Sequence, residues 1–215
     1  YCLTAECLLC LLPTMIYHKN VVPDVRIPVT YPKDAISAWA HPDSRAYLVS
    51  RGISREEAVS YDLGFGITGI WARRLIIPVY FKDKLECLQG RAITEGIEPR
   101  YLTQGWRSCY YPEHPISSRR LVIVEGPFDL YAVSRIHSHV LATLGNQPSQ
   151  PQIQQILSII DVADRVSILY DRGVLAEAYA LQLLLNPQVP TDVIELQDNK
   201  DAGECTTEQL RSILM

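Results

Sequence analysis

The spacing of hydrophobic positions changes at about residue 121. From there, short apolar runs alternate with segments of helical periodicity. We expect strands at 121–125, 139–145, 165–171 and 191–197, and helices at 128–136, 151–163, 174–185 and 206–215. Wholly apolar runs are typical of strands buried on both faces, and their alternation with helices of about ten residues predicts a parallel, doubly wound α/β sheet.

The preceding region has a different pattern. The stretch HPDSRAYLVSRG predicts a helix that starts near Pro42 and stops at Gly52. A second helix is expected to start at Ser54, with Glu57 completing a capping box three residues later. Residues 61–111 then carry the β-rich runs LIIPVYF, KLECLQGRAI and PRYLTQ, separated by turn sequences. These runs predict a small antiparallel β module.

The chain therefore divides into three predicted parts. These are a Cys-containing segment with a proline-containing linker over 1–34, a mixed α+β subdomain over 35–120, and the α/β domain over 121–215. No apolar run approaches the roughly 18 residues of a membrane span. The opening run CLLCLLPTMI is interrupted by Cys and Pro and follows no basic segment, unlike a signal peptide. We expect a cytoplasmic protein with no membrane partner.

Charge is distributed unevenly along the chain, whose formal net charge is −4. Residues 67–120 carry a net charge of +4, and residues 121–215 a net charge of −7. A basic middle beside an acidic C-terminal part suits a protein that holds a phosphate backbone and metal cations. Chance segregation of solvated charges is the alternative reading of this pattern.

Carboxylates follow several of the predicted strands. Glu125 and Asp171 end two of them, Asp198 and Asp201 follow the fourth, and Asp129 lies one helical turn past Glu125. A single strand-end carboxylate is usually solvated or placed at a helix N-terminus. Several at the carboxyl edge of one parallel sheet, where ligands bind, indicate a site for Mg²⁺ or Mn²⁺.

These motifs together resemble the Toprim domain, the metal-binding α/β module of primases, topoisomerases and some nucleases. The resemblance rests on VEGPFD, LATLGN, a strand ending in LYD, and DNKDAGE. Upstream, YLVSRGISREEAVSYDLGFG and the run from ARRLIIPVYF to EPRYLTQG resemble the RNA polymerase domain of bacterial and phage primases of the DnaG-like type. The resemblance covers about residues 41–213.

The resemblance implies a DNA primase core. Such a core makes short primers on single-stranded DNA from nucleoside triphosphates by metal-dependent nucleotidyl transfer, in a bacterium or phage-infected cell, with a replicative helicase as a possible partner. Glu125 and Asp171 would be catalytic, and Glu125, Asp129, Asp171 and Asp201 would hold Mg²⁺ or Mn²⁺. Template and nucleotide phosphates would be bound by Arg73, Arg74, Arg91, Arg100 and Tyr101.

One position departs from the family pattern. The family has a second aspartate two residues after the first, where this chain reads Asp171–Arg172–Gly173. Asp198 or Asp201 compensates, or one metal suffices, or the site is weakened, or Gly173 is a turn at which the alignment slips. Two other functions therefore stay open: a Toprim-family metal-dependent nuclease, and a degenerate module that only binds single-stranded nucleic acid.

The N-terminal cysteines raise a further alternative. Primases of this type often carry an N-terminal zinc ribbon, and Cys2 and Cys7 fit its second ligand pair. Cys2, Cys7, Cys10 and His18 are instead enough for one complete tetrahedral Zn²⁺ site. Buried thiols in an apolar segment are the third reading.

Overall fold

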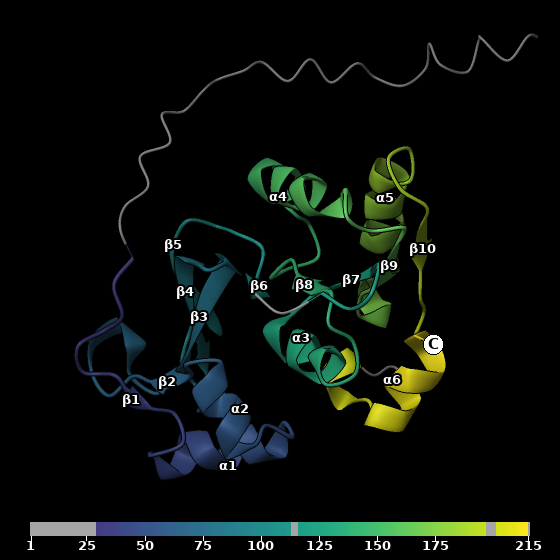
Figure 1. Cartoon of the computed structure of the whole chain (residues 1–215). Helices are drawn as coiled ribbons and strands as arrows, with labels where there is room; N and C mark the ends of the chain where they lie inside the picture. Colours follow the sequence, from purple (N-terminus) through teal and green to yellow (C-terminus); the bar gives the residue numbers. More distant parts are fainter. Residues whose placement is uncertain (1–28, 113–115, 197–200, 215) are drawn as a thin grey trace, which may run out of the picture.

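The computed structural model describes residues 29–112, 116–196 and 201–214, which form two β-sheets with their helices (Figure 1). Asp198 and the candidate zinc ligands Cys2, Cys7, Cys10 and His18 lie outside the described residues. Their predicted roles therefore stay predictions.

Two short helices precede the first large strands. Helix α1 spans Pro42–Ser50, and helix α2 spans Arg55–Ser60. The predicted capping box is present: the Glu57 amide donates to Ser54 Oγ over 3.1 Å, and the Ser54 amide donates to Glu57 Oε2 over 2.8 Å. Both helices thus begin where the sequence predicts, and α1 ends just before Gly52, as expected.

The first sheet is six-stranded and largely antiparallel. Its strands are β1 (Ile36–Ser37), β2 (Gly64–Phe65), β3 (Arg74–Lys82), β4 (Lys84–Ala92), β5 (Tyr101–Gly105) and β6 (Tyr111–Pro112), with the 3₁₀ turn η3 (Gly69–Trp71) after β2. Neighbours run in the order β1-β2-β3-β4-β5, and β6 pairs parallel with β3. This sheet confirms the predicted antiparallel β module.

The second sheet is four-stranded and wholly parallel, as predicted, in the order β10-β9-β7-β8. Its strands are β7 (Arg120–Val124), β8 (Val140–Ala142), β9 (Arg165–Leu169) and β10 (Thr191–Val193). Strands β8 and β10 are shorter than the apolar runs that predicted them, with three residues each. The sequence pattern therefore located these strands correctly but overestimated their length.

Helices cover both faces of this parallel sheet. They are α3 (Pro127–Ser134), α4 (Gln150–Ile160), α5 (Leu175–Leu185) and α6 (Thr207–Leu214), with 3₁₀ turns η4 (Arg172–Val174) and η5 (Ala202–Glu204). Figure 1 shows α4 and α5 on one side and α3 and α6 on the other. Within the described ranges, no helix is long and apolar enough to cross a bilayer.

Alternation along β7 explains why both faces are covered. Leu121 and Ile123 are buried with the residues of α4 and α5, and Val122 and Val124 with those of α3 and α6. Successive side chains of a strand point to opposite faces, so a continuous apolar run needs cover on each side. The prediction that this apolar run forms a strand buried on both faces is thus confirmed.

One hydrophobic cluster joins the two sheets. A single cluster of buried side chains contains Leu75 of β3 and Leu130 of α3. Aromatic rings join the two parts: Tyr61, beside α2, stacks on Tyr131 of α3 with ring centroids 4.1 Å apart, and Tyr110 meets Tyr131 edge-on at 6.0 Å. The predicted domain boundary at 120/121 is thus no break in the core, and it stays a prediction.

Candidate active site

The parallel sheet brings four of the predicted carboxylates together. Glu125 follows β7 and Asp171 follows β9, two paired strands in which Val124 lies opposite Leu169. Asp129 lies in the first turn of α3, and Asp201 lies directly before η5. All four line one cavity of about 370 Å³, which we call the charged cavity. These four carboxylates form one side of the charged cavity, which we call the acidic wall. As the sequence predicts, the ends of strands supply two of them, Glu125 and Asp171.

Asp129 is the most buried of the four, with an exposed fraction of 6%. Its Oδ2 accepts a hydrogen bond from the Gly126 amide and its Oδ1 one from the Gly203 amide, both over 2.9 Å. A Cβ on Gly203 would lie 3.3 Å from Oδ1 of Asp129 and equally far from Oδ1 of Asp201. Asp129 therefore connects the start of α3 to η5. Gly203 suits this position, because a larger residue would crowd the carboxylates of Asp129 and Asp201.

Burial and mutual repulsion disfavour the charged form of three of these carboxylates. Burial raises the pKa of Glu125 to about 7, and repulsion from Asp171, Glu177 and Asp201 acts in the same direction. Burial and the charges of Asp201 and Asp171 raise the pKa of Asp129 to about 7, although its two amide hydrogen bonds oppose the change. The pKa of Asp171 is raised by burial and by Asp201. Such a cluster is a place for a cation.

The donor set fits a magnesium-type ion. Oε2 of Glu125 and Oδ1 of Asp201 are buried and have no hydrogen-bond partner within the described residues. Among those residues, no three His, Cys, Asp or Glu side chains are arranged as a ready-made metal group. Mg²⁺ commonly uses one or two carboxylates and completes its shell with waters and substrate phosphates. Two orphaned carboxylate oxygens in an open cavity match that requirement.

Arginines line the same charged cavity as the carboxylates. Arg51, Arg91 and Arg100 contribute three guanidinium groups, and the Tyr101 ring lies among them. The Arg91 guanidinium carbon lies 5.0 Å from the centroid of the Tyr101 ring and 5.6 Å from that of Phe128. Burial lowers the pKa of Arg91, and the charges of Arg100 and Arg51 act in the same direction. Aromatic faces thus stabilise a concentrated positive charge that an anionic ligand would neutralise.

Sequence reasoning missed Arg51. It is the C-cap of α1, and its guanidinium carbon lies 5.6 Å from the Phe128 ring centroid and 5.9 Å from that of Tyr47. One signal was available: Arg51 follows Tyr47 by four residues, so both lie on the same face of the helix. That this face meets α3 is not evident from the sequence.

Two predicted phosphate-binding arginines lie outside the charged cavity. Arg73 is exposed and has a left-handed backbone, with φ of 58°. Arg74 is buried, and its Nη1 donates to the Pro99 carbonyl over 2.6 Å. Arg74 therefore supports the turn between β4 and β5, whereas the phosphate-binding role of both residues stays a prediction.

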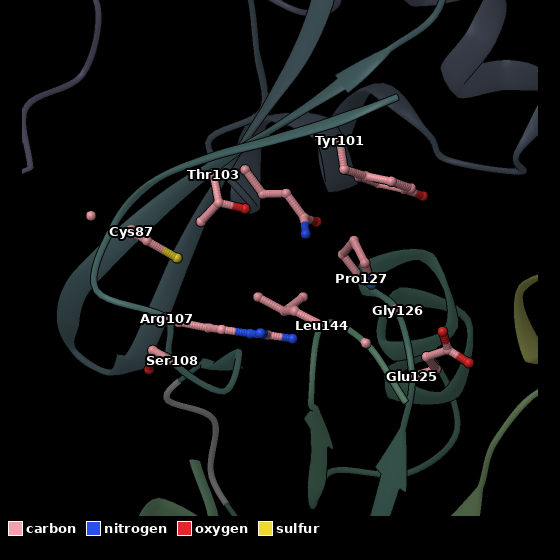
Figure 2. A pocket seen from close by; sticks show the side chains of 12 residues that line it. Cys87, Tyr101, Thr103, Arg107, Ser108, Glu125, Gly126, Pro127 and Leu144 are labelled. Carbon is pink, nitrogen blue, oxygen red and sulfur yellow. The ribbon is translucent and has the colours of Figure 1, made fainter. Parts of the chain in front are cut away.

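A second cavity adjoins the first. It has a volume of about 540 Å³ and lies between strands β4 and β5 and the ends of β7 and β8 (Figure 2). It is lined by Cys87, Gln89, Tyr101, Thr103, Gly105, Arg107, Ser108, Glu125, Gly126, Pro127, Leu144 and Gly145. We call it the neutral cavity, because Arg107 and Glu125 are the only charged residues among the described residues that line it, and their formal charges cancel.

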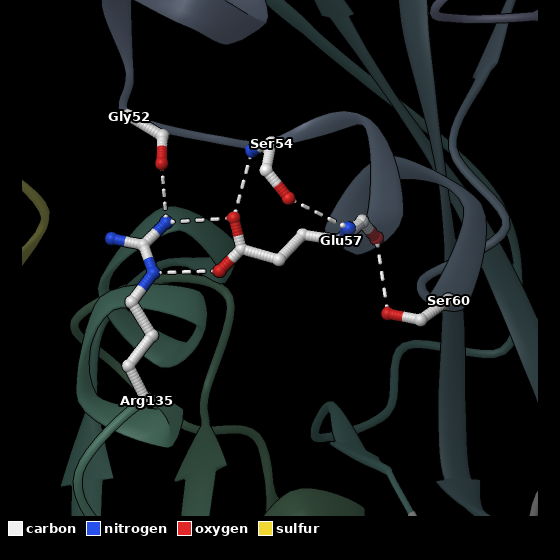
Figure 3. Close-up of polar contacts among 5 residues, drawn as sticks. All are labelled: Gly52, Ser54, Glu57, Ser60 and Arg135. Atoms are coloured by element: carbon white, nitrogen blue, oxygen red, sulfur yellow. Dashed lines mark hydrogen bonds and ion pairs between the residues drawn. The ribbon is translucent and has the colours of Figure 1, made fainter.

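Both cavities depend on the position of α3, which an ion pair fixes at its far end (Figure 3). Arg135 Nε donates to Glu57 Oε1 over 2.6 Å, and Arg135 Nη2 donates to the Gly52 carbonyl over 2.6 Å. Burial alone would raise the pKa of Glu57, but bonds from Arg135 and Ser54 hold that pKa below its usual value. Glu57 therefore caps α2 and binds the end of α3 with the same carboxylate.

Solved structures share this fold. The zinc-binding and RNA polymerase domains of the Aquifex aeolicus primase match with a TM-score of 0.63 and 23% identity, covering 82% of this chain and 56% of that one. The RNA polymerase domain of Mycobacterium tuberculosis primase DnaG gives 0.63 and 15%, covering 82% and 77%. The primase fragment of the bacteriophage T7 primase-helicase protein gives 0.66 and 13%, covering 90% and 80%.

These likenesses establish the fold: the chain has the architecture of primase RNA polymerase domains. It spans little more than half of the Aquifex aeolicus structure. No protein-family model matches the chain, and no curated protein matches it.

Replacing Arg135 tests the ion pair that positions α3. We expect Arg135→Met to lower the free energy of unfolding by about 1–2 kcal/mol, because the half-buried Glu57 carboxylate loses a two-pronged partner. Urea denaturation measures the change. Arg55→Met, at an exposed position of α2, is the matched control. Equal effects of the two substitutions would contradict the role of the pair.

The raised pKa of Glu125 predicts how stability depends on pH without divalent cations. Glu125 ionises near pH 4.5 when unfolded but near pH 7 when folded, so the folded state holds more protons between these values. The free energy of unfolding should therefore fall as pH rises through that interval. We expect Glu125→Gln to flatten the decline and to be more stable than the native chain by about 1–3 kcal/mol near pH 7.5.

Urea denaturation in EDTA across this pH range measures the effect. Glu95→Gln, in an exposed turn, is the control and should follow the native curve. A Glu125→Gln variant that is less stable than the native chain near pH 7.5 would show that the carboxylate has a partner.

Proposed function

We propose that this chain is the catalytic core of a DNA primase, which joins nucleotides on a single-stranded DNA template. One observation supports this most strongly: four carboxylates and three arginines line a single cavity in a fold shared with primase RNA polymerase domains. A nucleoside triphosphate with a divalent cation carries the charges that such a cavity complements. Glu125 and Asp171 would be the catalytic residues, with Asp129 and Asp201 completing the acidic wall.

The proposed reaction is an in-line displacement. The 3′-oxygen of one nucleotide forms a bond to the α-phosphorus of the incoming triphosphate, the bond from that phosphorus to the bridging oxygen breaks, and pyrophosphate leaves. Arg51, Arg91 and Arg100 would bind the triphosphate oxygens, since planar guanidinium groups bond two such oxygens at once. The Tyr101 ring, which lines the same cavity, would stack on a base.

Glu125 is suited to accept the proton of the attacking hydroxyl. Its pKa is raised to about 7, near the pH at which a general base works best. When bound, Mg²⁺ or Mn²⁺ would supply positive charge beside the hydroxyl and the phosphates. Asp129 would combine its predicted metal contact with a positioning role, because each of its oxygens accepts one backbone amide and keeps a second lone pair. It would orient Asp201 and the first turn of α3.

The template would lie along the antiparallel sheet. Residues 67–120, which contain β3, β4 and β5, carry a net charge of +4 beside the acidic domain. Positive charge attracts a phosphate backbone without regard to sequence. A replicative helicase as partner, and Zn²⁺ at the N-terminal cysteines, stay predictions from the resemblance.

Primer synthesis tests the proposal directly. We expect the chain to form short labelled products from ribonucleoside or deoxynucleoside triphosphates on single-stranded DNA, only with Mg²⁺ or Mn²⁺. Glu125→Gln should reduce the rate by about 100-fold or more, because the proton acceptor is lost. Glu95→Gln again serves as the control. Gel analysis of the products and filter binding of the template are the measurements.

Other outcomes separate the alternatives. Products from neither protein, with single-stranded DNA still bound, would favour the binding module, for which the main support is Gly173 in place of the aspartate that the family pattern has. Metal-dependent cleavage of the DNA, lost in Glu125→Gln, would favour the Toprim-family nuclease.

Restoring the missing carboxylate tests whether position 173 belongs to the metal site. A Cβ on Gly173 would have no neighbouring atom within 4 Å, so a side chain fits there. We expect Gly173→Asp to tighten Mn²⁺ binding by about three- to tenfold, because it adds a negative charge near Asp171. Calorimetric titration measures the affinity.

Gly173→Asn is the control, with the same shape and no charge. Similar affinities for both variants would show that position 173 faces away from the site, and that the family's second aspartate has no equivalent there.

A further inference from the structure

We infer that the neutral cavity holds the nucleotide unit that supplies the attacking 3′-hydroxyl, with Gln89 as a residue that recognises it. This inference deepens the proposed function and rests on it. The two cavities share Tyr101, Glu125, Gly126 and Pro127, so Glu125 borders both. Figure 2 shows Glu125 at one end of the neutral cavity, with its carboxylate turned away from Arg107.

The geometry of displacement assigns the two cavities. In an in-line reaction, the attacking oxygen and the leaving pyrophosphate lie on opposite sides of the α-phosphorus. The three arginines that suit the triphosphate line the charged cavity. The attacking hydroxyl must then approach from another direction while staying within reach of Glu125. The neutral cavity is the described space that meets both conditions.

The antiparallel sheet supplies two rows of side chains that run from one cavity to the other. On β4, Cys87, Gln89 and Arg91 are two residues apart and share a face of the sheet. On β5, their respective partners are Gly105, Thr103 and Tyr101. Gln89 and Thr103 thus line the neutral cavity, and the next pair, Arg91 and Tyr101, lines the charged one. Two neighbouring nucleotides would lie along these rows.

Gln89 has an unsatisfied polar atom. Its exposed fraction is 7%, and its Oε1 is buried with no hydrogen-bond partner within the described residues. A buried amide oxygen without a partner is unfavourable, so a ligand that donates a hydrogen bond to it is favoured. An amide both donates and accepts, which suits the edge of a base or the hydroxyls of a sugar.

The charge of the cavity indicates the form of the ligand. Arg107 is its single cation, and its guanidinium comes within 3.5 Å of the Cβ position of Gly145 on the facing wall. One guanidinium suits one phosphate group and not a triphosphate. A volume of about 540 Å³ lies within the range of small-molecule sites. A nucleoside 5′-monophosphate, or the 3′-terminal unit of a primer, is therefore the matching ligand.

Dinucleotide synthesis with separate substrates tests the inference. A nucleoside 5′-monophosphate serves as initiator and a labelled triphosphate as the incoming nucleotide, on single-stranded DNA. We expect Gln89→Leu to raise the KM of the initiator by about three- to tenfold and to leave the KM of the triphosphate within about twofold. Arg100→Met should have the opposite effect. Gln104→Leu, on an exposed neighbouring position of β5 that lines neither cavity, should change neither constant.

An unchanged initiator KM in Gln89→Leu, or an equal change in both constants, would overturn the inference. A loss of DNA affinity alone would assign Gln89 to the template and also overturn it. Circular dichroism checks the fold, and Thr103→Val replaces Gln89→Leu if that variant does not fold.

Failure of the proposed function gives a different result. If the native chain forms no dinucleotide, equilibrium binding of labelled nucleoside 5′-monophosphate decides the inference by itself. Binding that weakens in Gln89→Leu and persists in Arg100→Met supports the cavity assignment without any activity. Absence of binding to the native chain, or binding that Gln89→Leu leaves unchanged, rejects it.

Discussion

Burial of helix α3 along all but its last residue is the constraint on which both cavities depend. Every residue from Pro127 to Val133 is buried, against the parallel sheet on one side and the α1–α2 pair on the other. Phe128 packs beside Arg51 and Arg91, whereas Asp129, its neighbour, belongs to the acidic wall. One turn of helix therefore sets the distance between positive and negative charge. A shift of this turn would displace the arginines and the carboxylates of the charged cavity together, because close-packed interiors relax little.

The acidic wall could be predicted because it depends on local rules. Each apolar run marks a strand of the parallel sheet, parallel strands end at the same edge, and Glu125 and Asp171 come directly after two such runs. That both residues lie at one edge of the sheet needs no long-range information, whereas the direct pairing of β7 with β9 does. The capping box of Ser54 and Glu57 was predictable for the same reason, since its two partners are three residues apart.

The arginines of the charged cavity and the shape of the neutral cavity depend instead on how the two sheets pack against each other. Arg51 faces the site because α1 lies against Phe128, and Gln89 faces a cavity because β4 lies across from the ends of β7 and β8. Arg74 shows the same limit in reverse, since it is buried beside Pro99 and away from the charged cavity. Sequence periodicity identifies the buried face of an element but not the element that covers it.

The double role of Glu57 has a consequence for the order of events during synthesis on the ribosome. Its partner Arg135 is translated 78 residues later, about 4 to 16 s at ordinary elongation rates. Throughout this delay the α1–α2 pair has no α3 to cover it, and Tyr61 has no Tyr131 to stack on. The N-terminal half thus emerges with an exposed apolar surface that its own later sequence must cover. Codon choice and chaperone access between these two positions should therefore influence how much folded protein a cell obtains.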